Sequence, residues 1–98
     1  MRFVLDLTDS ALEDLDFFKK YEQTLTLDQM EVQLSHEPTT ATRNRKPLEP
    51  NPLGEWELRI GGYRVFYDIV VNEAMVKIKA IGYKEHNQLY FRGKEYPL

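Results

Sequence analysis

The sequence contains no cysteine and only two histidines, His36 and His86, in 98 residues. The lack of cysteine excludes a disulfide framework, a thiolate zinc site and a cysteine nucleophile. Two histidines so far apart do not favour a multi-histidine metal site. Apolar runs are only a few residues long, so no membrane span is predicted. The N-terminus MRFVLDL lacks the length and cleavage pattern of a signal peptide, so the expected compartment is the cytoplasm.

The sequence also lacks an excess of positive charge, because its formal net charge is −3. This charge is unevenly distributed. Residues 1–35 carry three basic and eight acidic side chains, a net −5, whereas residues 36–98 carry ten basic and eight acidic ones, a net +2. The position of the charges therefore says more about binding than their sum. A chain of this length has room for one hydrophobic core, and we expect a single domain over residues 1–98.

The first third of the chain predicts one strand followed by two helices. Apolar residues alternate with others over residues 2–7, which is typical of a strand. Thr8, Asp9 and Ser10 are all residue types that cap the start of a helix. Ser10 with Glu13 forms a capping-box pattern, and the helix is expected to continue to about Tyr21.

A second helix is predicted after a break at residues 24–26. Thr26 and Gln29 repeat the capping-box pattern, and an apolar stripe then continues to about Ser35. The two helices are expected to form an antiparallel pair.

Residues 36–54 contain four of the five prolines, which predicts an irregular loop. Arg43, Arg45 and Lys46 make this loop basic. A long loop in a small domain is usually functional, so these three residues are candidates for substrate binding.

Three antiparallel strands are predicted in the second half, at residues 56–60, 63–71 and 75–83. The pair Gly61–Gly62 favours a two-residue type I′ turn between the first two. In the last strand, simple alternation places Ile81 with Lys77 and Lys79, away from the core. The remaining residues, 84–98, are expected to form a turn and then an irregular or short element. The predicted fold is a two-layer α+β domain of order β-α-α-β-β-β, with an antiparallel meander sheet packed on a helix pair.

A two-residue turn at Gly61–Gly62 pairs Ile60 with Tyr63 and Arg59 with Arg64. The two arginines then lie side by side on the face of the sheet away from the core. Two adjacent arginines repel each other unless an anion lies between them. One interpretation is a phosphate site, because the planar guanidinium donates two parallel hydrogen bonds. The alternative is a solvated surface on which nearby carboxylates neutralise both arginines.

Lys84, His86 and Tyr90 follow the last strand and extend the possible site. Cations with a histidine and a tyrosine are suited to RNA cleavage by the ribose 2′-hydroxyl, which requires charge stabilisation and proton transfer. The alternatives are a surface histidine and a core tyrosine. Phe66 is predicted to face outward beside Arg64, where it is a candidate for base stacking.

Two segments, residues 58–67 (LRIGGYRVFY) and 81–90 (IGYKEHNQLY), resemble the RelE/ParE superfamily of type II toxins. The resemblance implies a cytoplasmic toxin held inactive by a cognate antitoxin that is encoded next to it. RelE-like members cut messenger RNA on the ribosome without metal or cofactor, whereas ParE-like members inhibit DNA gyrase. A third alternative is an attenuated homologue that mainly binds its antitoxin.

The resemblance also implies roles for individual residues. Arg64 matches the arginine that contacts the scissile phosphate, and Lys84 stands where a second arginine is common. Tyr90 matches a tyrosine of proton transfer, and His86 is a candidate general acid or base. The remaining candidates for substrate binding are Arg59, Phe66, Arg43, Arg45, Lys46, Lys77 and Lys79. The last five of these are cations that offset the negative charge of the strand residues Glu55 and Glu57.

Overall fold

The computed structural model describes residues 1–97, and Leu98, the last residue of the predicted domain and tail, lies outside the described residues. Helices, strands and one 3-10 turn (η1) follow one another along this part of the chain. Their bounds are β1 Val4–Leu7, α1 Asp9–Phe17, α2 Lys20–Leu34, β2 Arg45–Pro47, β3 Trp56–Ile60, β4 Tyr63–Val70, η1 Val71–Glu73, β5 Met75–Glu85, β6 Gln88–Phe91 and β7 Lys94–Tyr96. The predicted β-α-α-β-β-β order is confirmed, and β2, β6 and β7 are added to it.

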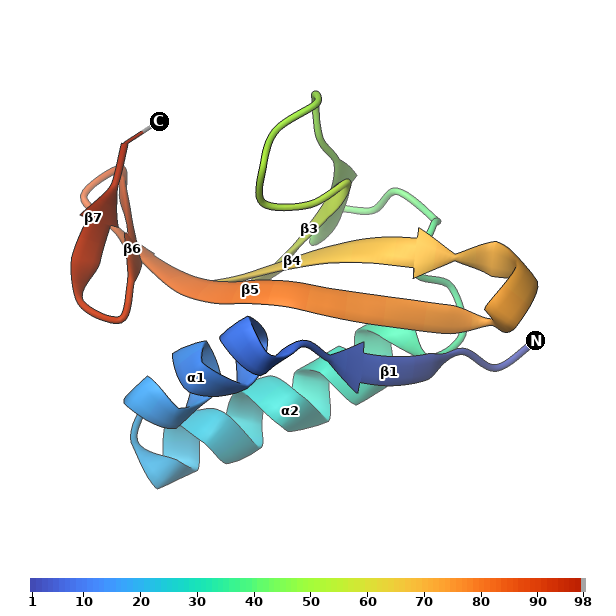
Figure 1. The fold of residues 1–98 in the computed structure, drawn as a ribbon, viewed down its shortest axis with the longest axis horizontal. Coiled ribbons are helices and arrows are strands. Elements are labelled where there is room, and N and C mark those ends of the chain that lie inside the picture. Colours follow the sequence, from blue (N-terminus) through green and yellow to red (C-terminus); the bar gives the residue numbers. More distant parts are fainter. Residues whose placement is uncertain (98) are drawn as a thin grey trace.

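The strands form one sheet in the order β2-β3-β4-β5-β6-β7, and β1 pairs with β5 as a parallel strand. Both helices cover one face of this sheet, which we call the helix-covered face (Figure 1). On the other side, the open face, the β6–β7 hairpin and the loop before β3 rise above the strands (Figure 1). The predicted two-layer α+β architecture is therefore confirmed.

The β3–β4 hairpin has the predicted register, because Ile60 pairs with Tyr63 and Arg59 with Arg64. The turn type differs from the predicted one. Only Gly61 has a positive φ, of 57°, whereas a type I′ turn needs positive φ at both central positions.

Strand β5 contains a bulge that simple alternation does not predict. Phe66 pairs with Ala80, the next residue of β4 pairs with Ile78, and Lys79 is therefore the extra residue. An extra residue reverses which side chains face the core beyond it. Ile81 is consequently buried in the core and not on the open face, which corrects the predicted alternation.

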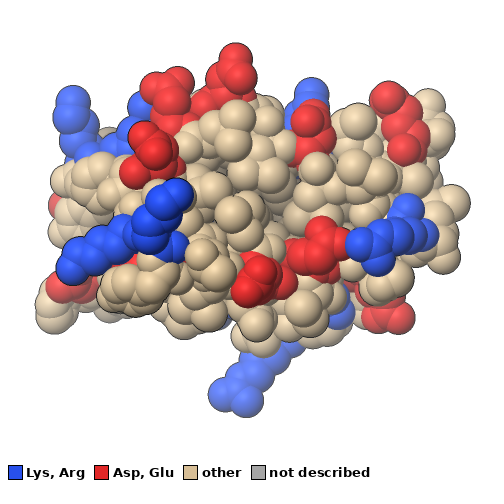
Figure 2. Space-filling view, turned by 90° about the horizontal axis from the view of Figure 1, so that it is seen from below, with Lys and Arg blue, Asp and Glu red and all other residues tan. Residues whose placement is uncertain are grey.

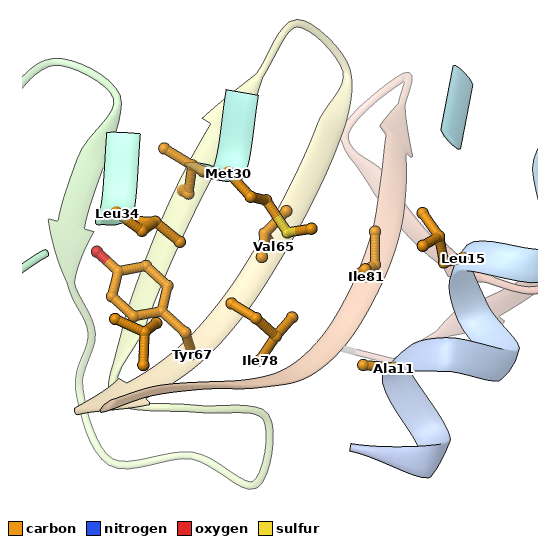
Figure 3. Packing of buried hydrophobic residues seen from close by; sticks show 10 residues of the cluster. Ala11, Leu15, Met30, Leu34, Val65, Tyr67, Ile78 and Ile81 are labelled. Atoms are coloured by element: carbon orange, nitrogen blue, oxygen red, sulfur yellow. The ribbon is translucent and has the colours of Figure 1, made fainter. Parts of the chain in front are cut away.

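The hydrophobic core lies between the two helices and the helix-covered face, with side chains of α1 and α2 directed toward β4 and β5 (Figure 3). Its buried members are Ala11, Leu15, Met30, Leu34, Leu58, Val65, Tyr67, Val76, Ile78 and Ile81. The Tyr67 hydroxyl donates a hydrogen bond to the Pro38 carbonyl oxygen at 2.7 Å, which satisfies the only polar atom of that side chain.

Helix α1 begins and ends earlier than predicted. Its N-cap is Thr8 and not Ser10, because the Thr8 hydroxyl accepts a hydrogen bond from the Ala11 N–H at 3.1 Å. The helix ends at Phe17, before the predicted end near Tyr21.

Helix α2 also begins earlier, at Lys20, so the predicted break at residues 24–26 is wrong. The Glu22 carboxylate accepts a hydrogen bond from the Lys19 N–H at 3.0 Å and stabilises the helix start. Thr26 is buried inside the helix, where its hydroxyl donates to the Glu22 carbonyl oxygen at 2.7 Å. No helix within residues 1–97 is long and apolar enough to cross a membrane.

The tail begins with the predicted turn, and the element expected to be irregular or short consists of two short strands, β6 and β7, joined by a second turn. His86 and Asn87, with φ of 50° and 65°, connect β5 to β6. Arg92 and Gly93, with φ of 52° and 76°, connect β6 to β7. Positive φ at both central positions is the requirement of a type I′ turn, so the tail continues the sheet without interruption.

Candidate functional site

Basic side chains gather on the open face near the Gly61–Gly62 turn. The register places Arg59 beside Arg64, and Arg64 beside Gly82 of β5. Lys84 lies two residues further along β5 and therefore on the same side. Its N–H donates to the Gly62 carbonyl oxygen at 2.8 Å, which holds it at the turn.

A fourth cation, Lys94, reaches the same side from β7. Lys94 pairs with Phe91 of β6. Leu89, two residues before Phe91 and therefore on the same side of β6, pairs with Lys84 of β5. Paired residues in an antiparallel ladder project to the same side of the sheet. Sequence reasoning misses Lys94 because it predicts no strand there. We call these four residues, Arg59, Arg64, Lys84 and Lys94, the basic end of the open face.

The Arg64 guanidinium is held over the turn. Its Nη1 donates to the carbonyl oxygens of Gly61, at 2.7 Å, and Tyr63, at 3.0 Å. Burial lowers the pKa of Arg64 from its usual value, the nearby Arg59 lowers it further, and Glu57 opposes this. A phosphate bound here would relieve the repulsion between the two guanidinium groups.

Among the described residues, one member of the basic end is neutralised by an ion pair. The Arg59 Nε lies 3.1 Å from a Glu57 carboxylate oxygen. Within residues 1–97 no ion pair involves the other three, Arg64, Lys84 and Lys94. Their charge therefore remains available to an anionic ligand.

The opposite end of the open face is close to neutral. Asp68 pairs in register with Lys77, and its Oδ2 lies 3.4 Å from the Lys79 Nζ. Lys46 of β2 pairs in register with Glu57. These three predicted substrate-binding lysines therefore each lie beside a carboxylate, which opposes the attraction of a phosphate.

Aromatic rings line the open face next to the basic end. The ring centroids of Phe66 and Phe91 are 5.9 Å apart, and those of Phe91 and Tyr96 are 5.6 Å apart. Phe66 is only 3% exposed, which corrects the expectation of an open ring ready for stacking. The β6–β7 hairpin covers Phe66 and brings Tyr96 to this face.

Tyr90 lies on the helix-covered face. It pairs with Tyr83, and Tyr83 pairs with Tyr63, whose hydroxyl donates to the Glu22 carboxylate of α2. Tyr90 accordingly lines a groove of about 480 Å³ that also contains residues of the helix junction and of the tail. This corrects the expectation that Tyr90 and Arg64 act on the same side of the sheet.

His86 is at the tip of the β5–β6 turn, two residues from Lys84. Its side chain is 89% exposed, and its Nε2 lies 3.6 Å from a Glu85 carboxylate oxygen. In the part of the chain that the structure describes, no three His, Asp or Glu side chains form a group able to hold a metal ion. The charge at the basic end comes from its arginines and lysines.

The arginines of the loop differ from each other. Arg43 is exposed, whereas Arg45 is only 9% exposed. The Arg45 guanidinium donates to the carbonyl oxygens of Thr40 and Gln33, and thereby fastens the loop to α2. Arg45 is a structural residue, which corrects its prediction as a substrate-binding one.

The helix-covered side carries acidic and basic groups scattered over a largely uncharged surface (Figure 2). The buried carboxylate of Asp14 is part of this layer. It accepts hydrogen bonds from the Ile81 N–H at 3.0 Å and from the Arg92 Nε at 2.8 Å. Its charge is therefore compensated inside the molecule and does not oppose the basic end.

The fold is similar to chains of three solved toxin–antitoxin complexes. One chain of the RelBE2 complex of Mycobacterium tuberculosis has a TM-score of 0.70 and 25% identity, with 86% of this chain and 100% of that chain covered. A chain of the archaeal RelE–RelB complex of Pyrococcus horikoshii OT3 has a TM-score of 0.66 and 20% identity, with 83% of this chain and 93% of that chain covered. A chain of the intact RelBE complex of E. coli has a TM-score of 0.50 and 18% identity, with 88% of this chain and 100% of that chain covered.

The architecture and these similarities define a toxin of the RelE/ParE superfamily. The sequence model described as the ParE toxin of the type II toxin–antitoxin system parDE matches residues 5–88. The chain therefore belongs to the ParE toxin family of type II toxin–antitoxin systems. No curated protein matches the sequence.

Proposed function

We propose that this toxin is a metal-independent endoribonuclease that acts in the cytoplasm and cleaves messenger RNA on the ribosome. The observation that carries this proposal is the basic end of the open face. Three of its cations have no ion pair with any residue from 1 to 97, and they lie on a face that the helices leave uncovered (Figure 1). A row of cations on an accessible sheet surface is suited to a single-stranded phosphate backbone.

The proposed reaction is attack of a ribose 2′-hydroxyl on the adjacent phosphate. The 2′-oxygen forms a bond to phosphorus, the bond to the 5′-oxygen breaks, and a 2′,3′-cyclic phosphate results. Arg64 and Lys84 stabilise the negative charge that increases on the phosphoryl oxygens. His86 takes the proton of the 2′-hydroxyl or gives one to the 5′-oxygen. We assign no step to Tyr90, because it lies on the opposite face.

A cognate antitoxin is the expected protein partner, since the similar solved structures are toxin–antitoxin complexes. We propose that it covers the open face, where an amphipathic segment would block Arg64 directly. Acidic residues in that segment would complement the basic end. The complex would then be inactive until the antitoxin is removed.

Cleavage of messenger RNA in a translating extract tests the proposal. Wild-type protein should produce new 5′ ends within codons, and Arg64→Ala should lower the rate about 100-fold through loss of charge stabilisation. Tyr90→Phe is the matched control on the opposite face and should stay within about twofold of wild type. Equal activity of wild type and Arg64→Ala would contradict the proposed site.

Inhibition of DNA gyrase is the second candidate function, favoured by the match to the ParE toxin family. It predicts inhibited supercoiling by purified gyrase and intact messenger RNA in the same extract. A protein without effect in either assay would be an attenuated homologue that mainly binds its antitoxin. The two assays on one preparation separate these outcomes.

A further inference from the structure

The family match leaves out the first four residues of this toxin and nearly all of the β6–β7 hairpin. The match ends at residue 88, where β6 begins, and the hairpin continues to Tyr96. The hairpin crosses one end of β5, with its turn at the level of α1 and its other end on the open side of the sheet (Figure 1). It adds side chains to the basic end that the matched region does not provide.

The hairpin is fixed in position by a buried carboxylate. Asp14 of α1 is 2% exposed and accepts a hydrogen bond from the Arg92 Nε in the β6–β7 turn. Glu13 accepts a second one from Arg92 at 3.2 Å. The same Asp14 also bonds the Ile81 N–H of β5. One buried group thus ties the helix, the central strand and the hairpin together, so the hairpin is preorganised.

The hairpin also packs directly on the strand that neighbours Arg64. A Cβ atom at Gly82 would come within 2.8 Å of the Phe91 ring and 2.7 Å of the Tyr90 carbonyl oxygen. Gly82 is the residue paired with Arg64. The absence of a side chain at Gly82 therefore lets the Phe91 ring lie against the strand position that pairs with Arg64.

Beside Phe91, the hairpin forms a shallow pocket of about 460 Å³. Its lining residues are Phe91, Arg92, Lys94, Glu95 and Tyr96. Tyr96 lies half-buried with its ring against Phe91, and Lys94 is exposed. Glu95 pairs with Tyr90 and so projects from the other side of the hairpin. The lining thus combines two aromatic rings with Arg92, Lys94 and one carboxylate, Glu95, and the ladder places Lys94, not Glu95, on the same side as the two rings.

We propose that this pocket is a nucleobase subsite for single-stranded RNA, in which a base stacks on Tyr96 while Lys94 contacts the adjacent phosphate. Aromatic rings stack on any base, and neighbouring cations bind the backbone. The inference rests on the proposed ribonuclease function and deepens it. A nucleotide flanking the one held at Arg64 would occupy the subsite, so the hairpin extends the RNA-binding surface beyond the reacting phosphate.

Binding of a fluorescently labelled eight-nucleotide RNA, measured by anisotropy, tests the subsite. Tyr96→Ala should weaken binding about tenfold, whereas Tyr96→Phe, which keeps a ring, should stay within about twofold. Lys94→Ala should lower affinity and reduce the salt dependence, with a change in slope of about 0.7. Tyr21→Ala, at an exposed tyrosine of α2, is the control and should bind as wild type.

A second arm uses the same RNA with abasic riboses, which retains the phosphates and lacks the bases. Wild type should bind this RNA about tenfold more weakly than the normal one, and Tyr96→Ala should show almost no difference between the two. Thermal unfolding of each variant shows that it is folded. Equal affinity of wild type and folded Tyr96→Ala for the normal RNA would overturn the subsite.

Cleavage in the translating extract distinguishes failure of the subsite from failure of the proposed function. If wild type cleaves RNA and Tyr96→Ala binds as wild type does, the ribonuclease proposal stands and the subsite is wrong. If binding depends on Tyr96 but no RNA is cleaved, the base-binding pocket stands and the catalytic proposal is wrong. If RNA is neither bound nor cleaved, both are wrong.

Discussion

The two faces of the sheet differ in whether their charged groups are bonded within the molecule. On the helix-covered face, three buried or partly buried groups are bonded inside the molecule: Asp14 to Arg92, Glu22 to Tyr63, and Arg45 to backbone carbonyls. At the basic end of the open face, three cations have no ion pair among the described residues. Charge on the first face stabilises the fold, whereas charge on the second is available to a ligand. The net charge of −3 therefore does not describe the surface that an RNA would meet.

The largest effect is expected from removing the buried carboxylate that connects the two faces. Asp14→Ala leaves the Ile81 N–H without its acceptor and separates Arg92 from α1. We expect the free energy of unfolding to fall by about 2–3 kcal/mol, measured by urea denaturation.

Glu13→Ala is the matched control, because it removes only the exposed partner of Arg92. It should cost less than about 1 kcal/mol. Equal losses for the two variants would show that the buried bond has no special role in holding the hairpin.

A smaller loss is expected when the hairpin is forced away from the open face. Gly82→Ala places a methyl group against the Tyr90 carbonyl and the Phe91 ring, which should cost about 2 kcal/mol by overpacking. Weaker RNA binding than wild type should accompany this loss.

Gly61→Ala is the comparison at the nearby turn, where a Cβ would meet open space. Its cost comes from the left-handed backbone alone, about 1 kcal/mol, and RNA binding should be unchanged. A Gly82→Ala variant with wild-type RNA affinity would contradict the placement of the hairpin beside the site.

The Tyr63–Glu22 hydrogen bond should contribute about 1 kcal/mol, which Tyr63→Phe removes. Burial and this bond raise the pKa of Tyr63, and the bond lowers the pKa of Glu22 below its ordinary 4.5. A carboxyl group whose pKa is lowered on folding stabilises the folded state at pH values above its pKa in the unfolded chain. This stabilisation is lost as the pH falls through the pKa of the folded state. A raised tyrosine pKa gives stability below pH 10 that is lost at higher pH.

The stability difference between wild type and Tyr63→Phe should therefore be largest between about pH 5 and pH 9. It should shrink below pH 4.5 and above pH 10. Urea denaturation across this pH range measures it. A difference that does not change with pH would mean that the hydroxyl acts only through packing.

The smallest effect is expected at the neutral end of the open face. The Lys79–Asp68 ion pair is partly exposed, so Lys79→Ala should change stability by less than about 1 kcal/mol. Because Asp68 already opposes the charge of Lys79, RNA affinity should change less than about twofold.

Local patterns in the sequence were sufficient to predict the order of the main elements and the β3–β4 register. The adjacent glycines set that register, and with it the pairing of Arg59 with Arg64. The helix boundary was not predictable in the same way. Thr26 and Gln29 form a good capping pattern, but Thr26 is buried in the packed helix, while Lys19 is an unusual residue at an N-cap.

The errors in the candidate site have a common cause in pairing between distant segments. The bulge at Lys79 depends on how β5 meets β4, and it decides that Ile81 faces the core. The face on which Tyr90 lies depends on its pairing with Tyr83, which requires the tail to be a strand. Neither the position of the bulge nor the pairing of the tail can be predicted from the spacing of residues in the sequence alone. The available sequence signal for the tail hairpin was Gly93 between the aromatic residues Phe91 and Tyr96, because glycine readily adopts the positive φ that a tight turn needs.

The most direct test measures RNA binding by Arg64→Ala and Lys79→Ala side by side over a range of salt concentrations. It tests the claim that cations at one end of the open face, and not at the other, are available to an anionic ligand. Both changes remove one cation from the same sheet. Arg64→Ala should lower affinity about tenfold and reduce the salt slope by about 0.7, while Lys79→Ala should leave both near wild type. Equal losses for the two variants would contradict the division of the open face into a basic end and a neutral end.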